Sequence, residues 1–217
     1  MNRKKIMVIV FFQVFTISSF GQLTQAQLDS IVNKYVLNLH STGIDTVCIY
    51  NEYCTGCLFT PTSTANLCTD NFSSLPTYIF WKRNGKTFIT KKDICFDYST
   101  IAISNNSFWQ YYFTNKNKIK KEELKTPKYT EIVNGKKETR SLDIDNSIYF
   151  KITIDAGNES VTKNINSFYF TEHLGASEEI NLNYGFNMAT SLANLHFQIQ
   201  DLIKHESVKN KFKRTLR

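Results

Sequence analysis

The sequence predicts an α+β fold, in which an antiparallel sheet of about five or more strands carries an N-terminal and a C-terminal helix packed on one face. Three observations lead to this class: an apolar stripe with helical spacing near each end of the chain, two Asn-Gly dipeptides between β-rich runs, and an alternating segment at residues 147–155. The chain of 217 residues is 41% hydrophobic and 14% aromatic, so it has enough apolar surface to bury a core.

The first helix is predicted over residues 25–40. Thr24 suits an N-cap, Gln27 lies three residues further on as a capping box requires, and Gly43 ends the run. The apolar residues that share one face of this helix are Leu28, Ile31, Val32, Tyr35 and Leu39.

Strands are predicted through the middle of the chain. Residues 45–51, DTVCIYN, are short and rich in β-branched residues, and the dipeptides Asn84-Gly85 and Asn134-Gly135 are each typical of a tight hairpin turn. Apolar and polar residues alternate along 147–155, which indicates a strand with one buried face, and a further strand follows it. The aromatic-rich segment that begins at Ser107 fits a short helix or a strand equally well.

The last helix is predicted over residues 187–205, followed by a basic tail at 207–217 that is expected to fray. Residues 22–206 are expected to form a single domain. The apolar stripe of this helix consists of Met188, Leu192, Leu195, Ile199 and Leu202.

The first 21 residues have the pattern of a secretory signal peptide. Arg3, Lys4 and Lys5 precede an apolar run of about ten residues, and small residues follow it. The ending SFGQ resembles export signals common among Bacteroidota. Removing these 21 residues, which carry three of the 26 basic groups, leaves 196 residues and lowers the formal net charge from +7 to +4. We therefore expect a secreted or periplasmic protein with no membrane anchor after cleavage.

Cysteines are concentrated in less than a quarter of the chain, and exported proteins keep cysteines as disulfides. The number favours two structural disulfides and one free thiol, with the pairing left open. Such cross-links would fix residues 55–74, which are rich in Thr, Ser, Asn and Pro and have few apolar residues to pack. The disulfide candidates are Cys48, Cys54, Cys57, Cys68 and Cys95.

The Cys54-Thr55-Gly56-Cys57 segment, with Pro76-Thr77 and a strand and hairpin after it, resembles the active-site region of thioredoxin-like proteins. This resemblance implies that Cys54 is a nucleophile at a helix N-terminus, Cys57 the resolving thiol and Pro76 a cis-proline. However, 18 residues separate Cys57 from Pro76, and the family's fold requires a helix, a strand and a connection in that interval. A thiol-disulfide oxidoreductase or redox sensor is therefore the alternative function.

Other chemistry is not indicated by the motifs. The chain has no phosphate-binding glycine loop or nucleophile elbow, and its four histidines are scattered, so we predict no catalytic residue, cofactor or metal site. Lysines follow the aromatic run FWQYYF, but Glu122 and Glu123 interrupt them, and an exported protein meets little nucleic acid.

The leading hypothesis is an exported, non-enzymatic binding or interaction domain. Its ligand is unknown, and its partner is an unknown protein or a component of the cell envelope. The predicted binding residues are Tyr50, Tyr53 and Phe59, which are expected to be exposed beside the cross-linked loop.

Overall fold

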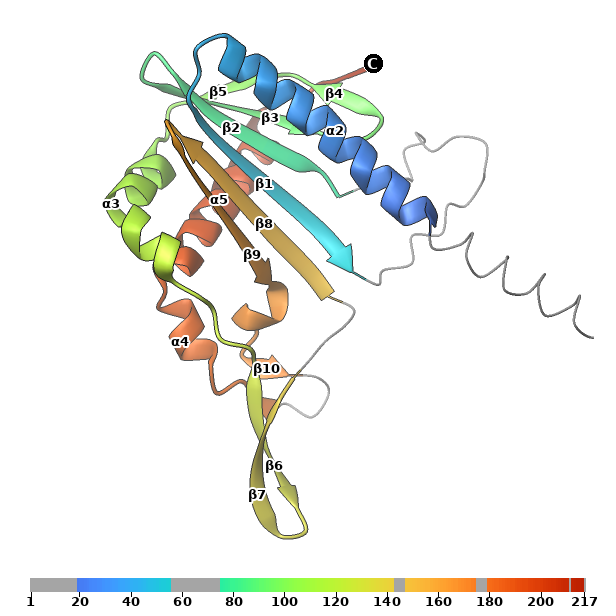
Figure 1. Ribbon diagram of the computed structural model, residues 1–217, viewed down its shortest axis with the longest axis vertical. Coiled ribbons are helices and arrows are strands. Elements are labelled where there is room, and N and C mark those ends of the chain that lie inside the picture. The colour runs from blue at the N-terminus through green and yellow to red at the C-terminus, as the bar shows by residue number, and fades with distance from the viewer. Residues whose placement is uncertain (1–18, 56–74, 143–146, 175–178, 211, 217) are drawn as a thin grey trace, which may run out of the picture.

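The computed structural model describes residues 19–55, 75–142, 147–174, 179–210 and 212–216. An antiparallel eight-stranded sheet lies at its centre (Figure 1), with the strand order β12-β4-β3-β2-β1-β8-β9 and with β5 paired to β3. The strands of this sheet are β1 (Thr46–Thr55), β2 (Thr77–Arg83), β3 (Lys86–Lys92), β4 (Phe96–Tyr98), β5 (Ile101–Ile103), β8 (Ser147–Ala156), β9 (Glu159–Asn166) and β12 (Arg214–Leu216).

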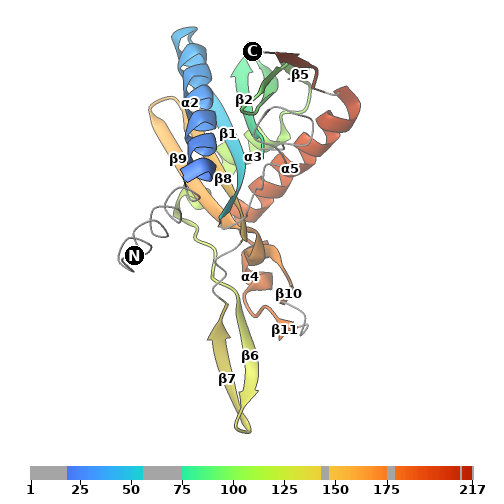
Figure 2. The ribbon, with the colours of Figure 1, turned by 90° about the vertical axis from the view of Figure 1, so that its right-hand side faces the viewer.

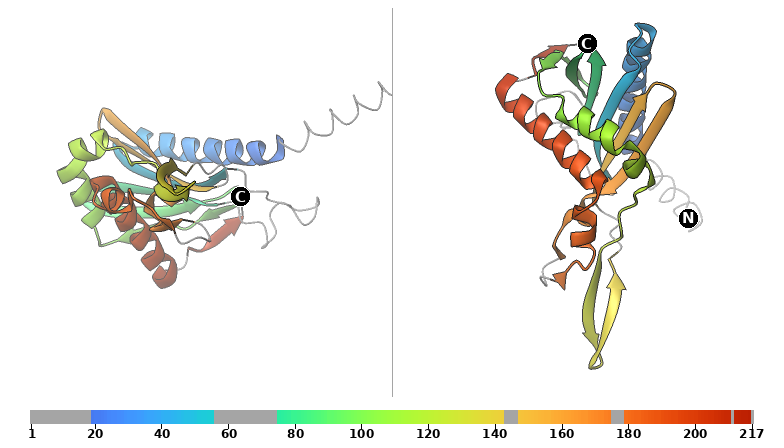
Figure 3. Two further views of the ribbon diagram at one scale, coloured as in Figure 1. Left: turned by 90° about the horizontal axis from the view of Figure 1, so that it is seen from below. Right: turned by 90° about the vertical axis from the view of Figure 1, so that its left-hand side faces the viewer.

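Helices cover both faces of the sheet. Helix α2 (Ser19–Ser41) lies on one face, and α3 (Ser107–Lys121) and α5 (Ser191–Asn210) lie on the other (Figure 3). The predicted α+β class with an antiparallel sheet is confirmed, but the prediction that both terminal helices share one face is wrong. The reason lies in β1, where Val47 packs into the α2 cluster and its neighbour Cys48 packs into the α5 cluster, so that both sides of the strand are apolar.

The helices extend beyond their predicted bounds. Helix α2 begins six residues before Gln25. Helix α5 begins at Ser191, four residues after its predicted start and after a separate short helix α4 (Tyr184–Met188), and it ends at Asn210, five residues beyond its predicted end. The ambiguous aromatic segment is the helix α3, because its large side chains recur at helical spacing and bury one face against the sheet. The buried residues of α3 are Phe108, Trp109, Tyr112 and Ile119.

Both predicted Asn-Gly hairpins are confirmed. Asn84 and Gly85 join β2 to β3, and Asn134 and Gly135 join β6 (Lys128–Val133) to β7 (Lys136–Ser141). All four residues have positive φ, from 51° to 76°, which is the conformation that a type I′ turn requires. The β6–β7 hairpin forms a sheet of its own outside the main one.

Part of the basic C-terminal tail, which was expected to fray, is ordered. Residues 214–216 form β12, which pairs with β4 at the edge of the sheet. Phe212 anchors this segment, because its ring lies 5.9 Å from the ring of Tyr78 and 6.5 Å from that of Tyr98. The segment is therefore held by Phe212, by the pairing with β4 and by two hydrogen bonds between Lys213 and Ser99.

Small elements that follow β9 in the chain lie between the sheet and the β6–β7 hairpin (Figure 1). They are the 3₁₀ helix η1 (Ser167–Phe170), the two-stranded pair β10 (His173–Leu174) and β11 (Glu179–Ile180), and helix α4. Figures 1 and 2 show them gathered at the end of the molecule from which the hairpin projects.

Candidate functional site

Two of the three predicted binding residues, Tyr50 and Tyr53, lie on opposite sides of the sheet. Tyr50 and Tyr53 are an odd number of residues apart on β1, so their side chains point to different faces. Tyr50 is 2% exposed, so the expectation that it is an exposed binding residue is wrong. Tyr53 is partly exposed on the α2 face, and Phe59 lies outside the described residues.

Tyr50 belongs to a buried aromatic cluster. Its ring lies 5.9 Å from the imidazole of His196 and 6.1 Å from the ring of Phe150, and its hydroxyl is 3.4 Å from Nδ1 of His196. Burial raises the pKa of the Tyr50 hydroxyl and lowers the pKa of His196 to about 4. His196 is 1% exposed, so this cluster is part of the core and offers no accessible acid or base.

Tyr53 instead forms a pair with a residue that sequence reasoning did not identify. Tyr149 lies directly opposite it on β8, and the two rings stack with centroids 5.3 Å apart and an interplanar angle of 15°. Burial, followed by the neighbouring Tyr149, raises the pKa of the Tyr53 hydroxyl. The alternation along 147–155 already placed Tyr149 on the less buried face of its strand, but only the register between β1 and β8 shows that it meets Tyr53.

The described helices leave part of the sheet around this tyrosine pair uncovered, and we call the β1–β8–β9 part of this side the open face. Helix α2 packs over β1, β2 and β3, and no described helix covers β8 and β9 on the same face (Figure 1). The side chains there are polar, and the hydroxyl groups of Thr153 and Thr162 lie 3.1 Å apart across the two strands. Lys151 and Asn164, which oppose each other one row closer to Tyr149, are exposed.

Two buried polar atoms on the same face have no hydrogen-bond partner among the described residues. Asn51 and Thr77 lie opposite each other on β1 and β2 and are 8% and 1% exposed, and Oδ1 of Asn51 and Oγ1 of Thr77 are both unsatisfied. Lys151 lies opposite Asn51 on the other side, so these residues form one polar row across the sheet. An unsatisfied buried oxygen is costly, and it is a natural acceptor for a ligand or an ordered water.

Lys92 extends this row on β3, where it lies opposite Thr77. Its ammonium group is 2.8 Å from the carboxylate of Asp97 and 4.2 Å from the centre of the Tyr35 ring on α2. The buried charge is therefore held by an ion pair and by an aromatic face, and it fixes α2 against the sheet beside the polar row.

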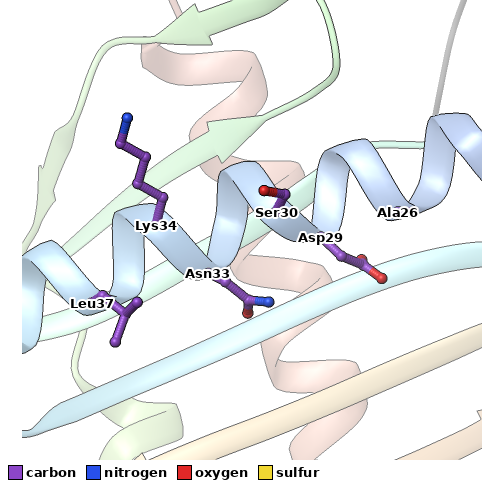
Figure 4. Close-up of a pocket in the computed structure, with 6 residues that line it drawn as sticks. All are labelled: Ala26, Asp29, Ser30, Asn33, Lys34 and Leu37. Atoms are coloured by element: carbon purple, nitrogen blue, oxygen red, sulfur yellow. The ribbon is translucent and has the colours of Figure 1, made fainter.

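A hollow of about 550 Å³ runs along α2 (Figure 4). In that view Asp29, Asn33 and Leu37 point to the flank of the helix where β1 and β8 run, and Lys34 points to the opposite flank. The residues that line the hollow are Ala26, Asp29, Ser30, Asn33, Lys34 and Leu37. All of them come from one helix, so the hollow does not bring together polar groups from distant parts of the chain, as an enzyme pocket does.

The cysteines occupy two different environments. Cys48 is a free cysteine and is fully buried, and burial raises the pKa of its thiol. Cys54, at the end of β1, and Cys95, just after β3, are partly exposed at one end of the sheet, because β1 and β3 both run toward that end on either side of β2. Cys57 and Cys68 lie outside the described residues.

The features implied by the thioredoxin-like resemblance are not present where the structure can be described. Cys54 is the ninth residue of the strand β1, so no helix N-terminus stabilises its thiolate. Pro76 is described, and no peptide bond between described residues is cis. The local likeness of short motifs therefore arises from a strand end and a hairpin in a fully antiparallel arrangement.

No group of three or more potential metal ligands is found in the described part of the chain. Among the described helices, none is both long and apolar enough to span a bilayer. Comparison of the chain with protein-family models, with curated proteins and with solved structures found no significant match. The function therefore has to be argued from the open face around Tyr53 itself.

Proposed function

We propose that this chain is an exported binding domain without catalysis of its own, and that it holds its ligand on the open face formed by β1, β8 and β9. The observation that carries the proposal is the stacked pair of Tyr53 and Tyr149 beside the unsatisfied buried oxygens of Asn51 and Thr77. Buried polar atoms are nearly always satisfied in folded proteins, so their position beside an uncovered surface supports a ligand there.

The chemistry of this face suits a polar ligand that contains a flat ring. The tyrosine rings offer apolar contact area, and the hydroxyl groups of Thr153 and Thr162 and the ammonium group of Lys151 offer hydrogen bonds around it. Sugar units of an envelope polysaccharide have this combination of a ring and many hydroxyl groups. An envelope component is therefore the ligand class that we test first.

Export through the N-terminal segment is part of the same proposal. Cleavage after Gly21 would remove only the first three residues of α2, and within residues 25–41 of this helix the first that packs into the core is Leu28. A mature chain that begins at Gln22 would therefore keep the helix and its contacts. The secreted or periplasmic location follows from this processing.

Disulfides are proposed to hold the chain between β1 and β2. Cys48 is free and buried, so the candidates for the bridges are the other four cysteines. Cys54 and Cys95 lie at the sheet end from which residues 56–74 depart, and that segment contains Cys57 and Cys68. Two bridges among these four cysteines would tie the segment to the ends of β1 and β3, next to the Tyr53 face.

The proposal is tested by following backbone amide NMR signals of the mature chain while chitohexaose, cellohexaose or a soluble muropeptide is added. We expect one of these probes to shift signals of β1, β8 and β9, and Tyr149→Ala to weaken its binding severalfold. The stacked pair contributes only about 0.5–1.5 kcal/mol, so the variant should stay folded. The control is Tyr111→Ala, which removes a partly buried tyrosine from α3 on the opposite face. If no probe shifts the signals of this face at millimolar concentration, the face is not a binding surface for such ligands.

A further inference from the structure

The β6–β7 hairpin is an arm that projects from the body of the molecule (Figure 2). Among the described strands, these two pair only with each other, over six residue pairs in register, and every residue of β7 is exposed. An isolated two-stranded hairpin is only marginally stable in water. An arm of this kind therefore needs either strong anchoring at its base or a partner along its length.

Asn187 anchors the base of the arm from within the fold. It is completely buried, its Oδ1 accepts a hydrogen bond of 2.8 Å from the backbone N–H of Lys125, and its Nδ2 donates to the carbonyl oxygens of Lys125 and Tyr169 at 2.8 and 3.0 Å. All these bonds reach backbone groups. The start of the arm is thus fixed to η1 and α4 whatever the side chains of the arm are.

Two more asparagines complete this anchor. The side chain of Asn181, which is 2% exposed, donates to the carbonyl oxygen of Thr171 and accepts from the backbone N–H groups of Lys128 and Asn183. Asn183 in turn donates to the carbonyl oxygen of Thr126 at 2.7 Å. The direction of the arm is therefore set before any partner binds, which lowers the entropy cost of binding.

The arm and the segment leading to it concentrate the positive charge of the protein. Residues 116–140 contain nine of the 26 basic residues and four of the 19 acidic ones, a net charge of +5, whereas the whole chain has +7. Arg140 lies 2.5 Å from the carboxylate of Glu131 and 3.7 Å from that of Glu138. Lys136 and Lys137 form no ion pair within the described residues, so their charge remains available to a partner.

The backbone of β7 offers an open edge. In the turn, the N–H of Lys136 bonds back toward Val133, so the backbone groups of Lys137, Thr139 and Ser141 point outward. The same alternation points the carbonyl oxygen of Lys128 away from the hairpin on the β6 side, where it accepts from the N–H of Leu182 at 2.8 Å. The base of β6 is thus covered, and in the described part of the chain no strand pairs with the outer edge of β7.

We propose that an extended acidic segment of a partner protein adds as a strand to the open edge of β7. Backbone hydrogen bonds to Lys137 and Thr139 would give affinity, and the lysine side chains would select acidic residues. The positive charge of β7 argues against a second copy of this chain as the occupant. Each β7 strand carries Lys136, Lys137 and Arg140 against the single acidic residue Glu138, a net charge of +2, so two β7 strands placed side by side would repel each other.

The test measures binding of a fluorescent octapeptide that alternates Glu and Val, by fluorescence anisotropy, to the full mature chain. We expect saturable binding that weakens as salt is added. Thr139→Pro removes an outward N–H without removing a bond within the hairpin, and it should weaken binding by about tenfold or more. The matched control is Thr130→Pro, which makes the same change opposite Thr139 on the β6 edge and should leave the affinity within about twofold.

A second variant distinguishes loss of a binding contact from local loss of structure in Thr139→Pro. Exchange of Lys136 and Lys137 for Glu leaves the backbone unchanged and should reduce binding of the acidic peptide by at least about tenfold. Absence of peptide binding at about 1 mM overturns the proposal. So does equal weakening by Thr130→Pro, or binding to phosphatidylglycerol vesicles that Thr139→Pro does not alter, which would indicate an anionic membrane surface instead. Tyr149→Ala should not change peptide binding, so the proposal for the arm is tested independently of the proposal for the Tyr53 face.

Discussion

The buried imidazole of His196 predicts a specific loss of stability at mildly acid pH. The ring is enclosed by Tyr50, Phe150, Phe170 and Phe197, and the hydroxyl of Tyr50 lies 3.4 Å from its Nδ1. Burial lowers the pKa of His196 from 6.5 to about 4 in the folded protein. As the pH falls below 6.5, His196 therefore binds a proton in the unfolded chain, whereas in the folded chain it binds one only near pH 4.

The size of this effect follows from the two pKa values. Each tenfold difference in proton affinity between folded and unfolded states is worth about 1.4 kcal/mol, so His196 accounts for about 3 kcal/mol. The contribution is fully present above pH 6.5, declines as the pH falls toward 4, and changes little below that. About 3 kcal/mol is a large part of the stability of a typical domain.

The assay is urea unfolding between pH 7.5 and 4 for the wild type, His196→Leu and His205→Gln. His205 is an exposed histidine of the same helix and serves as the matched control. The difference in unfolding free energy between wild type and His196→Leu should change by about 3 kcal/mol over this range, in favour of the variant at low pH, because leucine binds no proton. A difference that stays constant with pH, or an NMR titration of His196 with a midpoint near 6.5, would refute the reasoning.

Two further predictions concern buried groups of known geometry. Asn187→Ala leaves backbone groups of Lys125 and Tyr169 unsatisfied and should lower the unfolding free energy by about 2–4 kcal/mol. The control Asn183→Ala removes one partly exposed donor and should lower it by about 1 kcal/mol or less. Equal losses of unfolding free energy in urea would contradict the anchoring role of Asn187. Cys48 should resist iodoacetamide in the native protein and react once the chain is unfolded, because its thiol is buried and its pKa is raised, and mass spectrometry of the alkylated peptides would reveal any native reaction.

Local signals in the sequence predicted the individual elements well. Asn-Gly at 84–85 and 134–135 specified hairpins because few residue pairs accept positive φ at both central positions of a turn. The stripes of the two terminal helices were recognisable because each buries one face. Ser107 and the aromatic residues after it were ambiguous, since large aromatic side chains favour strands in isolation while their spacing fits a helix.

Longer-range relations could not be read in the same way. The burial of Tyr50 depends on Phe150 and His196, which are distant in the chain. The spacing of Tyr50 and Tyr53 along the strand indicates that they face opposite sides of the sheet, but it does not show which side is covered. The pairing of Tyr53 with Tyr149 depends on strand register. Similarly, the basic tail gave no sign that Phe212 would dock on the sheet and order β12.

The sequence by itself determined the α+β class, the hairpin turns, the helical stripes and the concentration of charge in residues 116–140, because each depends on residues close together in the chain. Only the tertiary structure decided that the terminal helices lie on opposite faces, that Tyr53 meets Tyr149 on an uncovered face, and that three asparagines hold a basic arm away from the body. The physical reason is that these features depend on which apolar surfaces bury each other and on which strands pair. Both are set by contacts between residues far apart in the chain.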